Sequence, residues 1–566
     1  MQTAATEEPR PGSLDPTQPR TDSCVFFPEL AQSERYLAFA IFLLAFSYLY
    51  LFRRYSTLDP DEGIILQGAQ RILDGQVLYR DFFSFFTPGS YYLFALVFRF
   101  FGNSYVVAHV ALAFFGAAFS PITYLLARRV CSRQASLLVT GLMTVSTLPW
   151  RFVVIHNWDS TFWACLAMYC AVRFLESPSM AWAFAAASFT SLAALSEQSK
   201  GVGLLLGLVA GFLIVASSSR EKLFTRDRLI AIGVGLVWPF LVTVAYFASR
   251  HTMATMLASW FWPLQHYSSA NRVPYGYDNM TGEARHRLFD SASPGIRLFA
   301  MLVFSARTWI PYLPLFGAAV LARLTFSRWR RVSISPVWAY YVLVSATISG
   351  LLLSIVIARA DYLHFIYLQP IFFLVLAWLF DGRGIRHPLF IRFAPELGFF
   401  LSMSLLAVAA QLLFQAGTTN FASTRRGAIA TQAPDPVIGY VQADVAPGEN
   451  ILVYPYQPTY YYLTHTYNPT RFDFYQPGMH TDQQLNEMLA DFSHHRTRVV
   501  LYEPNFTQHM ADAWPNTPPG AYARDAMAEY IKHEYRDCAA LNRQIVFMMR
   551  RDLPCPSQET TSSSGP

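Results

Sequence analysis

Long apolar runs recur along most of this chain and constrain its fold more than any other feature. We find eleven runs, at residues 36–52, 104–127, 135–150, 160–175, 181–196, 202–218, 229–249, 298–322, 336–357, 362–380 and 396–415. A helix needs roughly 20 apolar residues to cross the hydrocarbon core of a membrane. Only 14% of the residues are charged, whereas soluble domains carry about 25%. The sequence therefore predicts an α-helical polytopic membrane protein with about eleven transmembrane helices.

Basic residues gather in four short loops between these runs, at 128–133, 220–228, 323–331 and 383–392. If the spans alternate in direction, the four loops share one side, which the positive-inside rule assigns to the cytoplasm. Residues 1–34 are then a cytoplasmic, disordered N-terminus, and residues 35–415 form the transmembrane domain. Arg53-Arg54 at the outer end of the first run oppose this orientation but are outweighed. The net charge of +6 lies in these loops, so it does not indicate a nucleic-acid partner.

Residues 416–555 read as a small extracytoplasmic α/β domain, followed by a disordered tail at 556–566. Two β-branched, apolar stretches, 451–455 and 498–504, are typical of short buried strands. Between them, residues 481–495 carry apolar side chains at helical spacing, and 544–550 is a third candidate strand. Cys538 and Cys555 could pair if this domain lies outside the cytoplasm.

The first external loop, residues 53–90, begins with an acidic cluster. Asp59, Pro60, Asp61 and Glu62 match the start of a helix, with an N-cap acceptor, a proline at the first position and a glutamate at N3. The apolar stripe that follows predicts an amphipathic helix on the outer membrane face. The carboxylates could simply cap this helix. Alternatively, Asp59 caps it while Asp61 points into a cavity as a general base.

Three motifs in this loop resemble one known family. They are DEG at 61–63, DGxxxYRDFF at 74–83 and TPGSYY at 87–92. This order resembles bacterial lipid-linked glycosyltransferases of the GT-C fold, related to protein O-mannosyltransferases and to the aminoarabinose transferase of lipid A. The resemblance implies that Asp61-Glu62 is the catalytic pair, with Asp61 as base. It also implies a plasma-membrane enzyme of bacteria that uses a polyprenyl-phosphate-linked sugar donor.

Two further external turns carry candidate residues. Asp159 stands where the family often has an aspartate before the fourth span, and its alternative role is an N-cap. Lys200 lies at an outer span boundary, where related transferases often place a basic residue that could bind the lipid phosphate. The alternative for Lys200 is an ion pair with Glu197 or a snorkelling side chain.

The segment 358–370 resembles a pattern of Arg, Asp and His before an apolar span that contains proline. Here these residues are Arg359, Asp361 and His364. The planar guanidinium of Arg359 suits a pair of phosphate oxygens, and Asp361 could orient it or face the acceptor. The alternative is an ion pair at the membrane interface, which contributes little stability. Arg307 is a further candidate for phosphate binding, because ionisable groups at span depth usually serve function.

The sequence contains neither a Walker A loop nor a Rossmann fingerprint. It therefore gives no support to an ATP-driven pump or a cytosolic nucleotide-sugar enzyme. We expect an inverting glycosyltransferase that moves a monosaccharide from a polyprenyl phosphate to a hydroxyl group of an envelope glycan, lipid or protein. We expect no cofactor, and the sequence leaves open whether the protein binds a metal ion. The alternatives are a transporter or flippase of lipid-linked glycans and an inactive scaffold.

Overall fold

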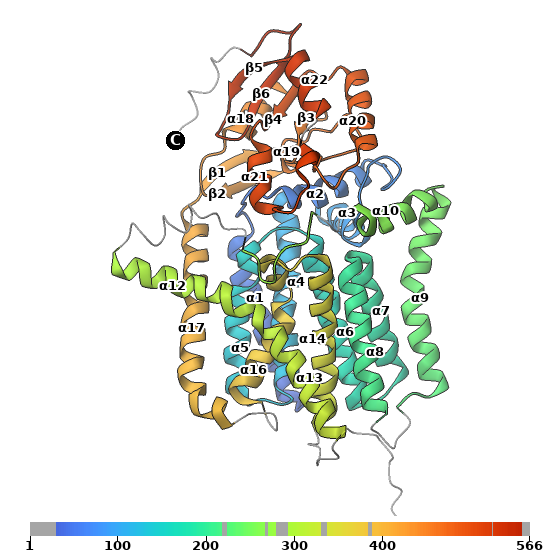
Figure 1. Cartoon of the computed structure of the whole chain (residues 1–566), viewed down its shortest axis with the longest axis vertical. Helices are drawn as coiled ribbons and strands as arrows, with labels where there is room; N and C mark the ends of the chain where they lie inside the picture. The colour runs from blue at the N-terminus through green and yellow to red at the C-terminus, as the bar shows by residue number, and fades with distance from the viewer. Residues whose placement is uncertain are drawn as a thin grey trace, which may run out of the picture.

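The computed structural model describes residues 30–217, 223–266, 270–278, 293–329, 337–382, 388–522 and 525–556. A bundle of long helices carries a small α/β domain on one end (Figure 1). The predicted disordered segments fall largely outside the described residues, at 1–29 and 557–566, but residues 32–34 already belong to the first helix.

The bundle is built from apolar helices of very different length. Its members are α1 (Gln32–Leu49), α4 (Tyr105–Ala127), α5 (Arg133–Ser146), α6 (His156–Glu176), α7 (Met180–Ser196), α8 (Gln198–Ala216), α9 (Arg226–Ser249), α12 (Pro294–Trp309), α13 (Leu313–Trp329), α14 (Trp338–Ala358), α16 (Gln369–Asp381) and α17 (Pro388–Gly417). Among the described residues, seven helical segments are long and apolar enough to cross a membrane. Shorter apolar helices, including α3 (Gly89–Phe101), accompany them. The expected polytopic membrane protein with a C-terminal α/β domain is confirmed.

The two ends of α1 show which side of the bundle each loop occupies. At its start, Glu34 forms ion pairs with Arg128 and Arg133 of the loop between α4 and α5, at 3.2 and 3.0 Å. Beyond its other end, the Ser56 amide donates to the Ala430 carbonyl of the C-terminal domain at 2.8 Å. The N-terminal end of α1 and the first basic loop therefore lie opposite the C-terminal domain, as the alternation of spans predicts.

Two predicted spans are divided in the structure. The run 298–322 is split between α12 and α13 by a short 3-10 turn that contains Pro311, and α12 crosses the view of Figure 1 at a shallow angle before α13 descends. The run 362–380 is split into α15 (Tyr362–Tyr367) and α16, with Pro370 at the start of α16. Proline has no N–H to donate to the preceding turn, so a helix ends or kinks there.

The amphipathic helix of the first external loop is α2 (Pro60–Leu73), and the C-terminal domain covers it. Its residues 62–71 are all buried, because α19 (Thr459–Thr464) of the C-terminal domain packs against it. A Cβ atom on Gly63 would lie 2.0 Å from the Thr459 nitrogen, so the close approach of α19 requires glycine. Arg71 pairs with Asp473 at 2.6 Å. The polar face of α2 therefore meets protein, which the periodicity of the sequence does not reveal.

The C-terminal domain has a four-stranded sheet in the order β3-β4-β6-β5. The strands are β3 (Leu452–Tyr454), β4 (Val499–Tyr502), β5 (Tyr535–Ala540) and β6 (Val546–Arg550), and β3 and β4 run parallel. One face packs on α20 (Asp482–His495) and α22 (Ala526–Glu534), and the other joins the core of the bundle. A two-stranded sheet, β1 (Asn420–Thr424) and β2 (Gly427–Thr431), leads to α18 (Pro436–Asp444). Cys538 and Cys555 form a disulfide.

Candidate active site

A cavity of about 340 Å³ lies where the bundle meets the C-terminal domain. Its walls come from six places: the start of α2, residues 85–86 before α3, the turn between α5 and α6, Asn271, the start of α15, and the C-terminal domain. The last of these includes α21 (Phe506–Ala513) and the residue after it, Trp514. The cavity therefore exists only when both parts of the chain are folded together.

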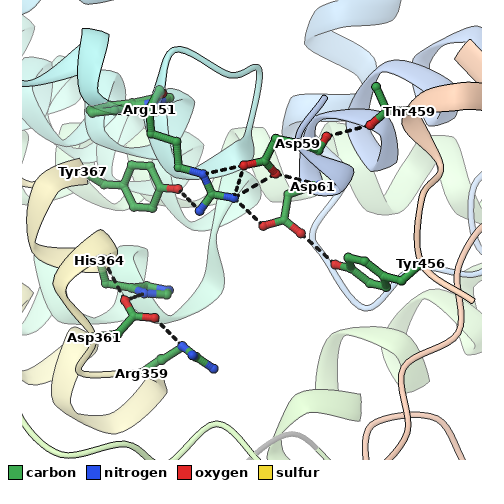
Figure 2. Close-up of polar contacts among 10 residues, drawn as sticks. Asp59, Asp61, Arg151, Arg359, Asp361, His364, Tyr367, Tyr456 and Thr459 are labelled. Carbon is green, nitrogen blue, oxygen red and sulfur yellow. Dashed lines mark hydrogen bonds and ion pairs between the residues drawn. The ribbon is translucent and has the colours of Figure 1, made fainter. Parts of the chain in front are cut away.

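Two carboxylates and one guanidinium form the acidic side of this cavity (Figure 2). Asp59 caps α2 by accepting from the Asp61 amide at 3.0 Å. Arg151 holds both oxygens of Asp59, at 3.0 Å each, and one oxygen of Asp61 at 2.8 Å. It also donates to the Tyr367 hydroxyl at 2.6 Å. With both carboxylates ionised, this cluster keeps one net negative charge, and Arg151 neutralises the other.

Asp59 and Asp61 both line the cavity, and Asp61 is the more exposed of the two. Its side chain is 32% exposed, compared with 18% for Asp59. The Tyr456 hydroxyl of the C-terminal domain donates to its second oxygen at 2.7 Å. Burial raises the pKa of Asp61, but Arg151 and Tyr456 together hold the pKa below the usual range of an aspartate. Asp61 is therefore ionised at neutral pH and can accept a proton.

A second charged group, Arg359 with Asp361 and His364, lines another wall of the same cavity. Asp361 caps α15 and accepts from His364 Nδ1 at 2.6 Å, and its other oxygen pairs with Arg359 Nε. Burial raises the pKa of Asp361, but His364 and Arg359 bring this pKa below its ordinary value. The aspartate thus orients both the guanidinium and the imidazole.

Arg359 is also held by the segments that cover the cavity. Its Nη1 donates to Asn271 Oδ1 at 3.1 Å, its Nη2 donates to the Ala513 carbonyl, and its guanidinium lies 5.2 Å from the centre of the Trp514 ring. A guanidinium has five N–H donors. The contacts with Asp361, Asn271 and Ala513 use three of these donors, so one N–H on each terminal nitrogen has no partner among the described residues.

The structure does not bring Glu62 into this cavity. The side chain is fully buried and accepts three hydrogen bonds, from Tyr105 at 2.9 Å, His109 at 2.6 Å and the Val154 amide at 2.8 Å. These contacts tie α2 to α4 and to the turn before α6. Glu62 therefore fixes the position of α2, and through it that of Asp61.

Replacing Glu62 should chiefly affect folding. The Glu62→Ala variant leaves three buried donors unpaired, so we expect a loss of about 3 kcal/mol or more in stability, measured as a fall of several degrees in Tm. Glu62→Gln, which keeps the shape and one acceptor, should lose less. A Glu62→Ala protein with wild-type Tm and no activity would contradict this role and indicate a chemical one.

Asp159 and Lys200 lie outside the lining of the cavity. Lys200 is buried and its ammonium contacts Glu197 at 2.9 Å, Ser160 at 2.8 Å and the Asn157 carbonyl at 2.8 Å. It thus joins the start of α8 to the start of α6, where Asn157 does line the cavity. Asp159 is buried in the first turn of α6. We read Lys200 as a support for the wall at Asn157, whereas neither carboxylate oxygen of Asp159 has a hydrogen-bond partner among the described residues.

Arg307 also lies outside the lining. It pairs with Asp278 at 3.0 Å and its guanidinium lies 5.6 Å from the Trp150 ring centre and 5.3 Å from that of Tyr362. Trp150 directly precedes Arg151, and Tyr362 directly follows Asp361. Arg307 therefore braces the two turns that carry the charged groups of the cavity.

Sequence reasoning missed three side chains that shape the site: Arg151, Tyr456 and Asn271. The sequence did contain a signal for Arg151. It is a lone arginine at the start of the second external turn, and the first external loop carries the candidate aspartates that it could pair with. Tyr456 and Asn271 stand in aromatic, polar stretches without a motif. Within the described residues, no cluster of three or more His, Cys, Asp or Glu side chains could hold a metal ion.

No protein-family model and no curated protein matches this chain. Among solved structures, it is similar to ArnT from Cupriavidus metallidurans bound to undecaprenyl phosphate, with 12% identity and a TM-score of 0.49 over 92% of this chain and 98% of that one. The apo state of ArnT gives 13% identity and 0.41 over the same shares. An oligosaccharyltransferase from Archaeoglobus fulgidus, in complex with Zn and sulfate, gives 12% and 0.43 over 88% of this chain and 71% of that one. All three TM-scores are below 0.5, so the function proposed next rests on the residues of the cavity.

Proposed function

We propose that this protein is an integral-membrane glycosyltransferase. It moves a monosaccharide from a polyprenyl-phosphate donor to an acceptor hydroxyl on the extracytoplasmic side, with inversion at the anomeric carbon. One observation carries the proposal: an ionised, accessible carboxylate, Asp61, and a buried guanidinium with unused donors, Arg359, line the same cavity. The GT-C resemblance of the first external loop supplies the donor class.

In this mechanism Asp61 takes the proton of the acceptor hydroxyl as the oxygen attacks the anomeric carbon. The bond between that carbon and the phosphate oxygen breaks, and its electron pair remains on the lipid phosphate. The two remaining N–H groups of Arg359 face the charge that builds on the phosphate and stabilise it in the transition state. Because a phosphate is a good leaving group, no strong acid is required opposite Asp61.

The proposed orientation places the cavity and the C-terminal domain outside the cytoplasm of a bacterial plasma membrane. The Cys538–Cys555 disulfide in that domain supports this side, because disulfides persist in oxidising compartments. The lipid chain of the donor would remain among the spans while its phosphate reaches Arg359.

The lowered pKa of Asp61 predicts the pH dependence of transfer. A base is active when deprotonated, so activity should fall only when the pH drops through its pKa. Because Arg151 and Tyr456 hold this pKa below the usual range, kcat/KM should stay level from about pH 7 down to about pH 5. An acid limb near pH 6 in the wild type would contradict this assignment.

The Arg151→Gln variant tests the cause of that pKa. Without the guanidinium, Asp59 and Asp61 face each other as like charges, which raises the pKa of the pair. The acid limb of kcat/KM should then move upward by about 1–3 pH units. Partial unfolding lowers activity at every pH, so only the charge effect gives such a shift.

The first test separates transfer from transport. Purified protein in sealed liposomes receives a radiolabelled polyprenyl-phosphate sugar in the leaflet that faces the C-terminal domain, with a crude cell-envelope fraction as acceptor. A transferase releases free polyprenyl phosphate and moves the label to the acceptor. Donor that reaches the opposite leaflet with its sugar still attached would contradict the proposal and support a flippase.

A further inference from the structure

A second, larger cavity of about 750 Å³ adjoins the candidate active site. It lies between the segment 55–60 that precedes and opens α2, the link 431–435 after β2, and the turn 542–544 between β5 and β6. Four residues line both cavities: Asp59, Pro60, Gln457 and Gln544. The two cavities are therefore neighbours beside the acidic cluster, and the outer one is lined in part by the exposed residues Thr57, Gln432 and Arg543.

The walls of this outer cavity are fixed by hydrogen bonds. The Ala430 amide donates to the Arg54 carbonyl at 2.7 Å, and the Ser56 amide donates to the Ala430 carbonyl at 2.8 Å. At the end of the link 431–435, Asp435 caps α18 and accepts from the Tyr460 hydroxyl at 2.9 Å. The cavity is thus preformed, as binding sites for small molecules usually are.

The lining consists mainly of amide, hydroxyl and phenol side chains. The amides are Gln432, Gln457, Asn542 and Gln544, and the phenols are Tyr55 and Tyr460. An amide offers two donors and one acceptor oxygen, which matches the paired hydroxyls of a sugar, and tyrosine adds an apolar ring with a polar end. The Oε1 atom of Gln457, at the junction of the two cavities, is buried and has no hydrogen-bond partner among the described residues.

We propose that this outer cavity binds the saccharide portion of the acceptor, so that the acceptor is a hydrophilic glycan. Its terminal hydroxyl would pass Gln457 and Gln544 to reach Asp61, while the rest of the glycan lies in the outer cavity. A lipid chain fits this lining poorly, and the protein has a separate apolar cavity of about 540 Å³ among α3, α6, α7 and α9, lined by residues such as Leu93, Leu96 and Trp163. This inference rests on the proposed glycosyltransferase function.

The test uses the full-length protein in lipid nanodiscs and a cavity-filling variant, Gln432→Trp. Gln432 is exposed and belongs to the outer cavity alone. The matched control is Gln483→Trp, at an exposed position of α20 outside both cavities. Three acceptor fractions are offered with the labelled donor: water-soluble glycan released from the envelope, extracted envelope lipid, and envelope protein.

The inference predicts label in the water-soluble glycan fraction. It also predicts that Gln432→Trp raises the KM for that glycan at least about tenfold. Slow hydrolysis of the donor by water, measured as polyprenyl phosphate released without acceptor, should stay at the wild-type level in Gln432→Trp, and Gln483→Trp should match the wild type in both assays.

Failure of the inference can be told apart from failure of the proposed function. Transfer to the lipid or protein fraction, or to glycan with an unchanged KM in Gln432→Trp, would overturn the glycan site while leaving the transferase intact. No release of polyprenyl phosphate by the wild type, with or without any acceptor, would overturn the transferase and the glycan site with it.

Discussion

The Asp61→Asn variant should lose transfer almost completely, with kcat falling by about 10²–10⁴-fold. An amide cannot take the proton of the acceptor hydroxyl, yet it occupies the same space and can still accept from Tyr456. Arg151 keeps its two bonds to Asp59, so the turn before α6 should stay in place. Label in the acceptor reports activity, and Tm in nanodiscs reports folding.

The control for this variant is Asp482→Asn. Asp482 is an exposed aspartate in the first turn of α20, as Asp61 is in the first turn of α2, but it lies outside the cavity. The Asp482→Asn variant should transfer the sugar at the wild-type rate. Transfer by Asp61→Asn at the wild-type rate, with unchanged Tm, would remove Asp61 from the chemistry.

Removing the guanidinium of Arg359 should give the second largest loss. In Arg359→Ala the lipid phosphate loses its cation in a buried cavity, and we expect kcat to fall by about 10²–10³-fold. Arg359→Lys restores the charge without the planar fork, so it should recover part of kcat and little of the affinity for the donor. Single-turnover kinetics with saturating donor would separate the two effects.

Because Arg359 also contacts the Ala513 carbonyl and Trp514, its loss could loosen the cover of the cavity. Arg99→Ala, at an exposed position of α3 outside the cavity, is the matched control. A structural effect alone would lower Tm and leave the kcat of the folded protein near wild type. That result would exclude Arg359 from phosphate stabilisation.

Much of the architecture could be predicted because transmembrane helices and buried strands have a characteristic apolar composition. The apolar runs indicate the bundle, and the stretches 451–455, 498–504 and 544–550 overlap β3, β4 and β6. The division of two apolar runs into separate helices was harder to predict, because only the short turn at 310–312 separates α12 from α13. An apolar run does not say whether its residues cross the membrane in one straight helix.

For the candidate active site, the sequence could not show which side chains face the cavity. Asp61 and Glu62 are neighbours, and successive residues of a helix point about 100° apart, so one reaches the cavity while the other enters the bundle. Which one does so depends on the packing of α2 against α4 and α19. Tyr456 is 395 positions from Asp61 in the chain, and only the docking of the C-terminal domain brings them together.

The most direct test of the central claim uses a donor labelled with one isotope in the sugar and another in the phosphate. The account predicts that the sugar label moves to the acceptor while the phosphate label stays in the lipid fraction, in equal amounts, and that Asp61→Asn abolishes this separation. Both labels moving together into the acceptor, or both crossing the membrane on intact donor, would contradict the account.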